Sequence, residues 1–275
     1  MDIEVNNYIC VTCGTQYPAA PAPPEACRIC TDDRQYISSE GQAWTTLEAL
    51  QADRRNVLRA LEPGLTGIRT EPHFAIGQQA HLVQSPGGNV LWDCISLIDR
   101  STVEAVGALG GIRAIAISHP HFYATMIEWS RAFDAPIYLH ASNREWVMRP
   151  DPSVVYWDGD TYSLGDGLTL IRCGGHFPGS TVLHWASGAE GRGALFSGDT
   201  ITVVADRRYV SFLYSYPNQI PLPAAAIRGI VNAVEPLRYD RIYGGWLDSI
   251  VRSDAKAGVR FSAERYIRAI QGQQV

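Results

Sequence analysis

Two histidines placed directly after a strand-like run restrict this chain more than any other feature. Residues 112–117 are apolar except for Arg113, His119 and His121 follow them, and a helix-like spacing of apolar residues then runs to Phe133. The ends of strands beside the starts of helices are where α/β proteins place their sites. Two imidazoles two residues apart in an extended turn can both reach one metal ion. The segment therefore predicts a metal site at the end of a strand.

Two further metal-ligand side chains stand downstream, each next to a strand-like run. His176 lies in the glycine-rich stretch 174–180, and Asp199 closes the stretch Leu-Phe-Ser-Gly-Asp. A lone histidine is more often a hydrogen-bonded structural residue than a ligand, and a chain whose histidines only hydrogen-bond is the alternative. Three imidazoles and a carboxylate suit Zn²⁺, Fe²⁺ or Mn²⁺. Their order at successive strand ends favours a metal site with an open position for water.

These motifs resemble the metallo-β-lactamase superfamily, the glyoxalase-II-like metal-dependent hydrolases. The family signature is His-x-His-x-Asp-His, then Gly-His near Pro-Gly, then Gly-Asp, then a last His. The matching stretch runs over roughly residues 65–270, a usual length for one domain. The resemblance implies an α/β (α+β) fold in which two mixed sheets form a four-layer αββα sandwich.

The chain departs from that signature at three places. Tyr123 stands where the Asp is expected, Ala124 where the next His is expected, and Trp246 where the last His is expected. In the resembled family these three positions normally build a second metal site. The resemblance therefore implies a single ion, held by the first-site ligands His119, His121, His176 and Asp199.

Several side chains near these motifs are candidates for chemistry. Asp199 could complete the metal shell or orient water, and Tyr123 could donate a hydrogen bond to a developing oxyanion or be a core aromatic. His140 ends the strand 137–139 and could act as an acid or base, or cap the chain end. Asp93 matches a family Asp that supports the metal-site loops from behind.

The pocket around the ion is expected to be partly aromatic. Trp246 could close it with apolar surface or be ordinary core. Arg207 and Tyr216 come from residues 206–218, a segment dense in Arg and Tyr, and could contact a substrate. A solvated loop or a contact in a homodimer is the alternative for these two residues.

Two Cys-x-x-Cys pairs mark a second metal site. Cys10, Cys13, Cys27 and Cys30 offer four thiolates, a set that suits tetrahedral zinc or a single iron. The first pair resembles a rubredoxin or zinc-ribbon knuckle. A segment this short needs such a staple to fold, which disfavours a plain dithiol or disulfides. We expect structural Zn²⁺ here, with iron and electron transfer as the alternative.

The chain is expected to contain three parts. Residues 1–40 form the four-cysteine module, residues 41–64 a linker helix, and residues 65–275 the metallo-β-lactamase-like domain. The linker prediction rests on residues 42–61, whose apolar residues recur with charges between them. Pro63-Gly64 is expected to end that helix.

Composition limits the partners. The formal net charge is −5, which argues against a nucleic-acid partner held through phosphates. No segment is apolar enough for a membrane span, and Met1–Val5 lack the pattern of a signal peptide. We expect a cytoplasmic protein that acts on a small-molecule substrate.

The leading hypothesis is a hydrolase that uses one Zn²⁺ or Fe²⁺ ion to activate water on an ester, thioester or lactone-like substrate. An alternative is a mononuclear non-haem iron oxygenase acting on a thiol or persulfide, with His119, His176 and Asp199 as its facial triad. A member of the fold that binds a ligand without catalysis is another. The identity of the metal distinguishes these alternatives.

Overall fold

The computed structural model describes residues 5–274. Most of the N-terminal stretch considered for a signal peptide, residues 1–4, lies outside the described residues. The chain forms two compact units, one of residues up to Leu139 together with Arg144–Tyr156, the other of His140–Asn143 together with the chain from Trp157. Each unit is described by itself.

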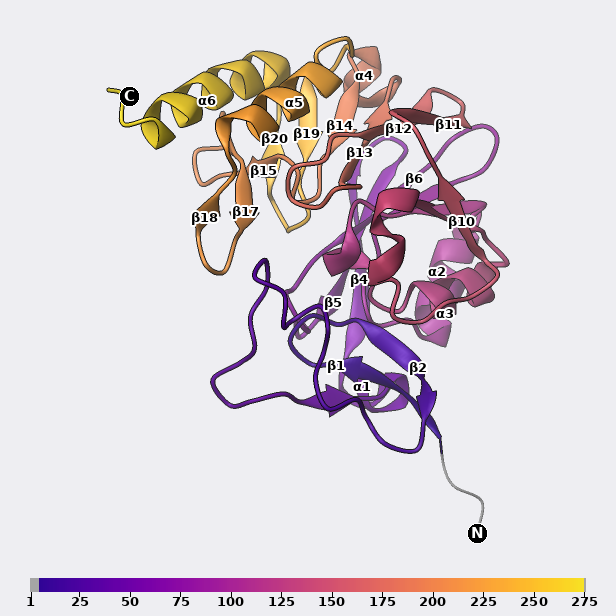
Figure 1. The fold of residues 1–275 in the computed structure, drawn as a ribbon. Helices are drawn as coiled ribbons and strands as arrows, with labels where there is room; N and C mark the ends of the chain where they lie inside the picture. Colours follow the sequence, from indigo (N-terminus) through magenta and orange to yellow (C-terminus); the bar gives the residue numbers. More distant parts are fainter. Residues whose placement is uncertain (1–4, 275) are drawn as a thin grey trace. The chain divides into compact units, whose positions relative to one another are not determined.

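The first unit contains the elements from β1 to β10 (Figure 1). They are β1 (Asn6–Cys10), β2 (Gln16–Ala20), β3 (Trp44–Thr45), α1 (Leu47–Asp53), β4 (Arg55–Glu62), β5 (Leu65–Glu71), β6 (Ala80–Val83), β7 (Val90–Trp92), α2 (Arg100–Ala108), β8 (Ala114–Ala116), η1 (Pro120–Phe122), α3 (Met126–Phe133), β9 (Ile137–His140), η2 (Ala141–Trp146) and β10 (Val154–Trp157). The last residues of β9 and β10, and the start of η2, belong to the second unit.

A mixed sheet is the centre of the first unit. Among the described residues it has seven strands in the order β10-β9-β8-β7-β6-β5-β4. Strands β4 to β7 pair antiparallel, whereas β7, β8 and β9 run parallel. The residues of β6, β7 and β8 are all buried, and all of them except His81 are apolar, as is typical of strands covered on both faces. Parallel pairing brings the ends of β7, β8 and β9 to one edge.

The linker helix expected over residues 42–61 is wrong in its second half. Only Leu47–Asp53 are helical, beginning at Thr46, whose side chain accepts a hydrogen bond from Ala49 N. Residues Arg55–Glu62 form β4, which pairs along its length with β5. Pro63-Gly64 is therefore the turn of a β-hairpin, with φ of 80° at Gly64. Cross-strand pairing outweighed a weak helical pattern.

The four-cysteine segment folds on a small sheet of its own. Strand β1 pairs antiparallel with β2 on one side and with β3 on the other. Helix α1 packs against this sheet, and Ile9, Leu50 and Leu97 share a buried apolar cluster. The segment is thus joined to the unit by apolar contact as well as by the chain.

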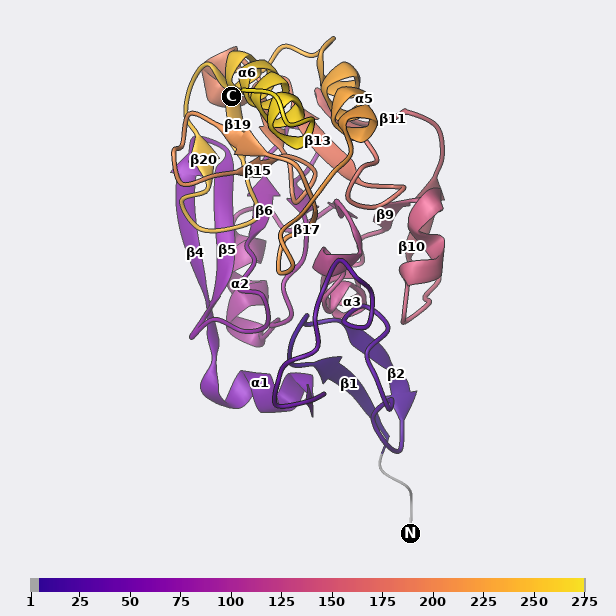
Figure 2. The ribbon, with the colours of Figure 1, turned by 60° about the vertical axis from the view of Figure 1, so that its left-hand side comes forward.

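The second unit contains the elements from β11 to α6 (Figure 2). They are β11 (Thr161–Gly165), β12 (Leu168–Arg172), β13 (Thr181–Trp185), α4 (Gly188–Gly191), β14 (Ala194–Phe196), β15 (Thr202–Val203), β16 (Val210–Ser211), β17 (Leu213–Ser215), β18 (Ile220–Pro221), α5 (Ala224–Val234), β19 (Arg241–Tyr243), β20 (Ile250–Val251) and α6 (Ala255–Ile270).

A mixed sheet is the centre of the second unit, and the segments that contain His176 and Asp199 follow its strands β12 and β14. In the described residues its order is β11-β12-β13-β14-β19-β20. β12 and β13 are antiparallel, so the loop 173–180 joins their ends, and β14 lies parallel to β19 with Phe196 opposite Tyr243. Helices α5 and α6 lie side by side, and Ile227, Ile230 and Val259 enter the buried core of this unit.

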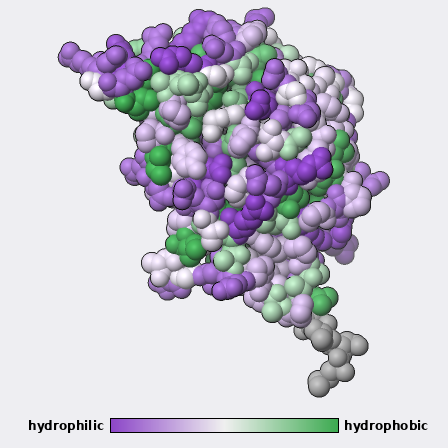
Figure 3. Space-filling model, in the orientation of Figure 1, coloured by the Kyte–Doolittle hydropathy of each residue, from purple (hydrophilic) through white to green (hydrophobic). Residues whose placement is uncertain are grey.

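The described surface is mixed in character. On the face drawn in Figure 3, hydrophilic residues are interspersed with smaller hydrophobic areas. Among residues 5–274, none of the helices combines the length and the apolar character that crossing a bilayer requires.

Candidate metal centres

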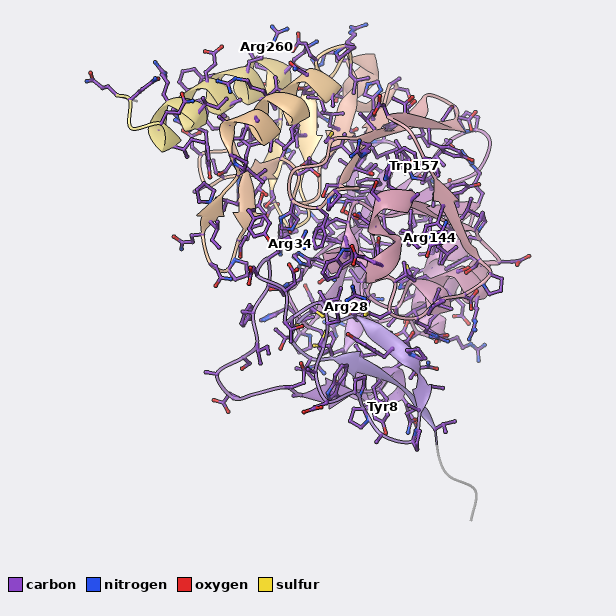
Figure 4. The ribbon with its side chains drawn as sticks, viewed as in Figure 1. Tyr8, Arg28, Arg34, Arg144, Trp157 and Arg260 are labelled. Atoms are coloured by element: carbon purple, nitrogen blue, oxygen red, sulfur yellow. The ribbon has the colours of Figure 1, made fainter. Side chains whose placement is uncertain are left out.

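The four paired cysteines converge in the first unit. The Sγ atoms of Cys10 and Cys30 are 3.6 Å apart, as are those of Cys13 and Cys27, and all four side chains are buried. Figure 4 shows sulfur atoms, drawn in yellow, close to the label of Arg28. Four sulfurs at about 2.3 Å from a tetrahedral zinc ion would lie about 3.8 Å from one another. The donor set and its spacing fit such an ion.

Two of these sulfurs accept hydrogen bonds from side chains outside the cluster. Tyr17 Oη donates to Cys27 Sγ at 3.4 Å, and Gln42 Nε2 donates to Cys10 Sγ at 3.2 Å. Hydrogen bonds from the other thiols, Cys13 first, hold the pKa of Cys10 below its usual range, whereas burial raises the pKa of Cys13. Donors directed at sulfur favour thiolates, the form that binds metal.

His119 and His121 belong to the turn that follows β8. The Ser118 hydroxyl lies 2.8 Å from Nδ1 of His119, so the opposite nitrogen, Nε2, is the one that could bind an ion. The two imidazole rings are 5.0 Å apart, edge to face. Asp93 follows β7, the strand beside β8, and its Oδ1 accepts a hydrogen bond from Ser118 N at 2.7 Å. Its carboxylate fixes the start of the histidine turn.

The segment between β8 and α3 is longer than the helix-like spacing of the sequence predicts. Pro120–Phe122 form one 3₁₀ turn, and the α-helix begins only at Met126. Between them Ala124 has φ of 44°, in the left-handed region, which costs an alanine about 1–2 kcal/mol. Tyr123 is buried beside it.

His176 and Asp199 come together in the second unit. Nε2 of His176 lies 3.7 Å from Oδ2 of Asp199, near the roughly 3.4 Å expected for two ligands about 2.1 Å from a tetrahedral ion. Nδ1 of His176 donates to the Leu213 carbonyl at 3.3 Å, which turns Nε2 toward Asp199. The ring of Phe177 packs edge-on against His176. Both candidate ligands are buried.

Tyr216 lies beside this pair. Its hydroxyl donates to the main-chain oxygen of Asp199 at 2.7 Å and accepts from Thr202. Its ring packs on the His176 imidazole with centroids 5.6 Å apart. Burial raises the pKa of the Tyr216 hydroxyl above its usual range, so this group is a neutral donor. The hydroxyl expected to face a substrate is directed at the backbone of Asp199.

Both ring nitrogens of His140 are engaged in main-chain hydrogen bonds. Nε2 donates to the Gly159 carbonyl at 3.0 Å, and Nδ1 accepts from Ser142 N at 3.2 Å. The ring stands edge-on to Trp157. Burial lowers the pKa of His140, opposed by the Gly159 contact. Acid–base work would require one of these bonds to break.

The remaining pocket candidates lie on turns of the second unit. Trp246 is half-buried in the β19–β20 turn, where its carbonyl accepts from Ser249 N. Arg207 is exposed on the β15–β16 turn and donates to the Val204 carbonyl at 2.8 Å. Arg207 and Arg252 help to line a surface hollow of about 410 Å³.

Sequence reasoning missed the groups that orient the ligands. Ser118 directly precedes His119, so a hydroxyl within reach of the ring was a readable signal. The Leu213 carbonyl is 37 residues from His176 in sequence, and no local pattern could have shown it.

Comparison with known proteins gives both a family and a fold. No family model matches the chain. The chain is 50% identical over 268 residues, covering 97% of both sequences, to the uncharacterized protein YmaE of Bacillus subtilis (strain 168). The chain belongs to the YmaE family. That relative carries no named activity.

Solved structures are similar at low sequence identity. The metallo-β-lactamase DIM-1 aligns with a TM-score of 0.59 at 15% identity, covering 78% of this chain and 98% of that one. The metallo-β-lactamase FIM-1 of Pseudomonas aeruginosa, in its mono-zinc form, aligns with a TM-score of 0.57 at 15% identity, covering 76% and 95%. These likenesses confirm the expected metallo-β-lactamase fold class.

Proposed function

We propose that this chain is a metal-dependent hydrolase that uses one ion held by His119, His121, His176 and Asp199. The observation that carries the proposal is the pair of buried, oriented ligand sets, one in each unit of a metallo-β-lactamase fold. Such residues are costly to bury unless they are paired or bind metal. The donor set of three imidazoles and one carboxylate fits Zn²⁺ or Fe²⁺.

The orientation of the ligands supports binding. Metal-binding histidines usually donate their second ring nitrogen to a fixed group, which sets the tautomer. The contact of His176 with Leu213 has this form, and Ser118 holds His119 in a similar way. Asp93 acts one step further out, through the Ser118 amide.

A single ion is proposed because Tyr123, Ala124 and Trp246 offer a phenol, a methyl group and an indole at the second-site positions. A neutral phenol, with a reference pKa of about 10, is a weak ligand. The similar FIM-1 structure is described as a mono-zinc form, so this fold accommodates one zinc ion.

When bound, a zinc ion lowers the pKa of water from about 15.7 to about 7 and so supplies a nucleophile at neutral pH. Asp199 would hold a water proton beside the ion. Tyr123 would donate to the oxyanion that forms on an ester, thioester or lactone carbonyl. His140 receives no role in this proposal, because both its nitrogens are committed.

The proposed substrate is a small molecule, with Trp246 as an apolar wall and Arg207 as a contact for a negative group. The four-cysteine module is proposed to hold structural Zn²⁺. We place the protein in the cytoplasm, where paired cysteines more often bind metal than form disulfides.

The test is a panel of ester, thioester, lactone and thiol or persulfide substrates, run in air and under nitrogen. Hydrolysis should proceed equally in both and rise with pH through a value of about 7. His121→Ala and His176→Ala should reduce it to a similar extent, because both hold the ion. Arg260→Ala, on the exposed face of α6, is the control and should retain full activity.

Turnover that stops under nitrogen would replace the hydrolase with an iron oxygenase. In that case His121→Ala should be mild, since His119, His176 and Asp199 suffice for a facial triad. Metal-loaded protein that turns over none of the panel would leave a binding protein as the better description.

A further inference from the structure

The four-cysteine segment is bound directly to the turn that carries His119 and His121. Gln16 begins β2, three residues after Cys13, and its backbone N donates to the Ala124 carbonyl at 3.0 Å. Ala124 is the last residue of the histidine turn before Thr125, which occupies the N-cap position of α3. A main-chain hydrogen bond therefore ties the first cysteine pair to the far end of the turn.

Gln16 is held on its other side as well. Its side-chain oxygen accepts from Arg149, and the same Arg149 nitrogen contacts Glu128 in α3. Gln16 and Arg149 are both buried. Buried ionic contacts of this kind are strongly destabilised when one partner is removed. The position of β2 is thus fixed relative to the helix that follows the histidines.

Ser96 joins the cysteine knuckle to the same place by a second route. Its hydroxyl donates to the Gly14 carbonyl at 3.0 Å, and its own carbonyl accepts from the Thr125 hydroxyl at 3.0 Å. Gly14 has φ of 80°, and a Cβ there would lie 2.3 Å from the Ser96 hydroxyl oxygen. The close approach of this knuckle to Ser96 requires a glycine.

These contacts hold Ala124 in a strained backbone conformation. A non-glycine residue in the left-handed region persists only where its surroundings over-determine it. The groups outside the turn and α3 that contact residues 124–125 include Gln16 N and the carbonyls of Ile95 and Ser96. Gly14 and Gln16 both follow the first Cys-x-x-Cys pair closely, so their positions depend on the fold of that knuckle.

The second cysteine pair is fastened to the same unit. The Arg28 guanidinium donates to the carbonyl and the carboxylate of Glu145. Arg28 and Arg34 each lie 5.1 Å from the Trp146 ring centroid, and both arginines are labelled in Figure 4. The two knuckles therefore contact the rest of the unit at separate points. One ion bound by all four sulfurs would fix the positions of these two contacts relative to each other.

We propose that the four-cysteine module is a positioning element for the histidine turn, so that metal in the cysteine site sets the geometry of His119 and His121. For its effect on catalysis the inference rests on the function proposed above. Coupling between two sites is reciprocal in binding free energy. A filled cysteine site should therefore raise the metal affinity of the His site.

Hydrogen exchange of the backbone amides of residues 118–126 tests this in the full-length, metal-loaded chain. We call the contacts that join the cysteine module to the histidine turn the brace: Gln16 N to the Ala124 carbonyl, and Ser96 to Gly14 and Thr125. Ser96→Ala removes one hydrogen bond of the brace and leaves the four thiols in place. Exchange of these amides should become about tenfold faster, within the usual range of coupling energies. Cys27→Ser, which disrupts the cysteine site, should accelerate it further.

Ser85→Ala is the matched control. Ser85 also donates from its hydroxyl to a glycine carbonyl in the same unit, that of Gly88, but in the β6–β7 turn. Exchange at residues 118–126 should be unchanged in this variant. The proposal is overturned if Ser96→Ala matches Ser85→Ala and if Cys27→Ser loses its metal without any change at the turn.

The same measurement in a His176→Ala background separates this inference from the proposed function. The brace lies wholly within the first unit, so the effect of Ser96→Ala on exchange should persist where the His site has lost a ligand. If the effect of Ser96→Ala on exchange persists but the parent protein has no hydrolase activity, the proposed function is contradicted and the positioning role of the module is supported. A lost effect would contradict the brace alone.

Discussion

At the scale of single residues, three of the four candidate ligands of the His site, His119, His176 and Asp199, contact a neighbour that is not itself a candidate ligand. Ser118 contacts Nδ1 of His119, the Leu213 carbonyl contacts Nδ1 of His176, and Tyr216 donates to the carbonyl of Asp199. Such supporting groups typically alter metal affinity by about 10–100-fold when removed. They are the residues where substitution separates positioning from binding.

Tyr216→Phe should weaken metal binding at the His site about tenfold, because it removes the bond to Asp199 and retains the ring on His176. Chelator competition with Co²⁺ would measure the affinity, and the visible spectrum of bound Co²⁺ should shift. Tyr209→Phe, on the β15–β16 turn with its ring against Phe261, is the control and should bind normally. Equal affinity in the two variants would contradict a positioning role for Tyr216.

His81 should make stability depend on pH. Burial lowers its pKa to about 3, against about 6.5 in the unfolded chain. Between these values the unfolded state binds more protons, so this contribution to stability is complete above about pH 6.5 and is lost as the pH falls.

Denaturant unfolding of the parent and His81→Gln at several pH values between 4 and 7 would measure this contribution. The variant should show a slope of stability with pH that is smaller by up to about 1.4 kcal/mol per pH unit. Parallel curves for the two proteins would show that His81 is not the responsible group.

At the scale of elements, the sequence predicted where the strands end, but it did not predict the hydrogen bonds that hold the residues after them. Apolar runs before His119 and Asp199 located β8 and β14, because a buried strand must be apolar along its length. The hydrogen bonds of His140 to Gly159 and of Tyr216 to Asp199 join residues 19 and 17 positions apart. No periodicity encodes such contacts, so the roles expected for His140 and Tyr216 could not be refined from the sequence.

The misplaced helix has a similar cause. In residues 55–62 the apolar residues satisfy a helical spacing and a strand pattern about equally, and such short runs are ambiguous. Pairing of β4 with β5 decided the outcome. Pro63-Gly64, interpreted as a helix end, was equally consistent with a hairpin turn.

Helix α3 offers a test of backbone strain at an element boundary. Asp134 ends it in the left-handed region, with φ of 51°, and is exposed. Asp134→Gly should raise the free energy of unfolding by up to about 1 kcal/mol, since glycine adopts this conformation without steric cost. Ala132→Gly, at the penultimate residue of the same helix, should lower it by up to about 1 kcal/mol. Denaturant titration should give opposite signs, and the same sign for both would contradict this account.

At the scale of the whole molecule, the order of motifs along the chain predicted the fold class, which the similar solved structures confirm. The four-cysteine cluster was also predictable, because paired cysteines at this spacing have few other uses. How the module is fastened to the histidine turn was not predictable, since it depends on a main-chain bond to Ala124.

Cys13→Ser should release about one metal ion per chain and expose the module to proteolysis, because binding and folding are coupled in small metal sites. Element analysis and limited proteolysis would measure the two effects. Cys173→Ser, at a partly buried cysteine outside the cluster, should retain the full metal content. Unchanged metal and cleavage in Cys13→Ser would contradict a metal site in the module.

The central proposal is that His119, His121, His176 and Asp199 hold a single ion. Element analysis after dialysis against a weak chelator tests it in the parent, His119→Ala, His176→Ala and the double variant. The parent should retain about two ions per chain, one of them in the module, and every variant about one. The double variant should equal each single variant, because all three lose the same ion. A double variant that loses about one ion more than either single variant would show that His119 and His176 bind metal independently, and would contradict the account.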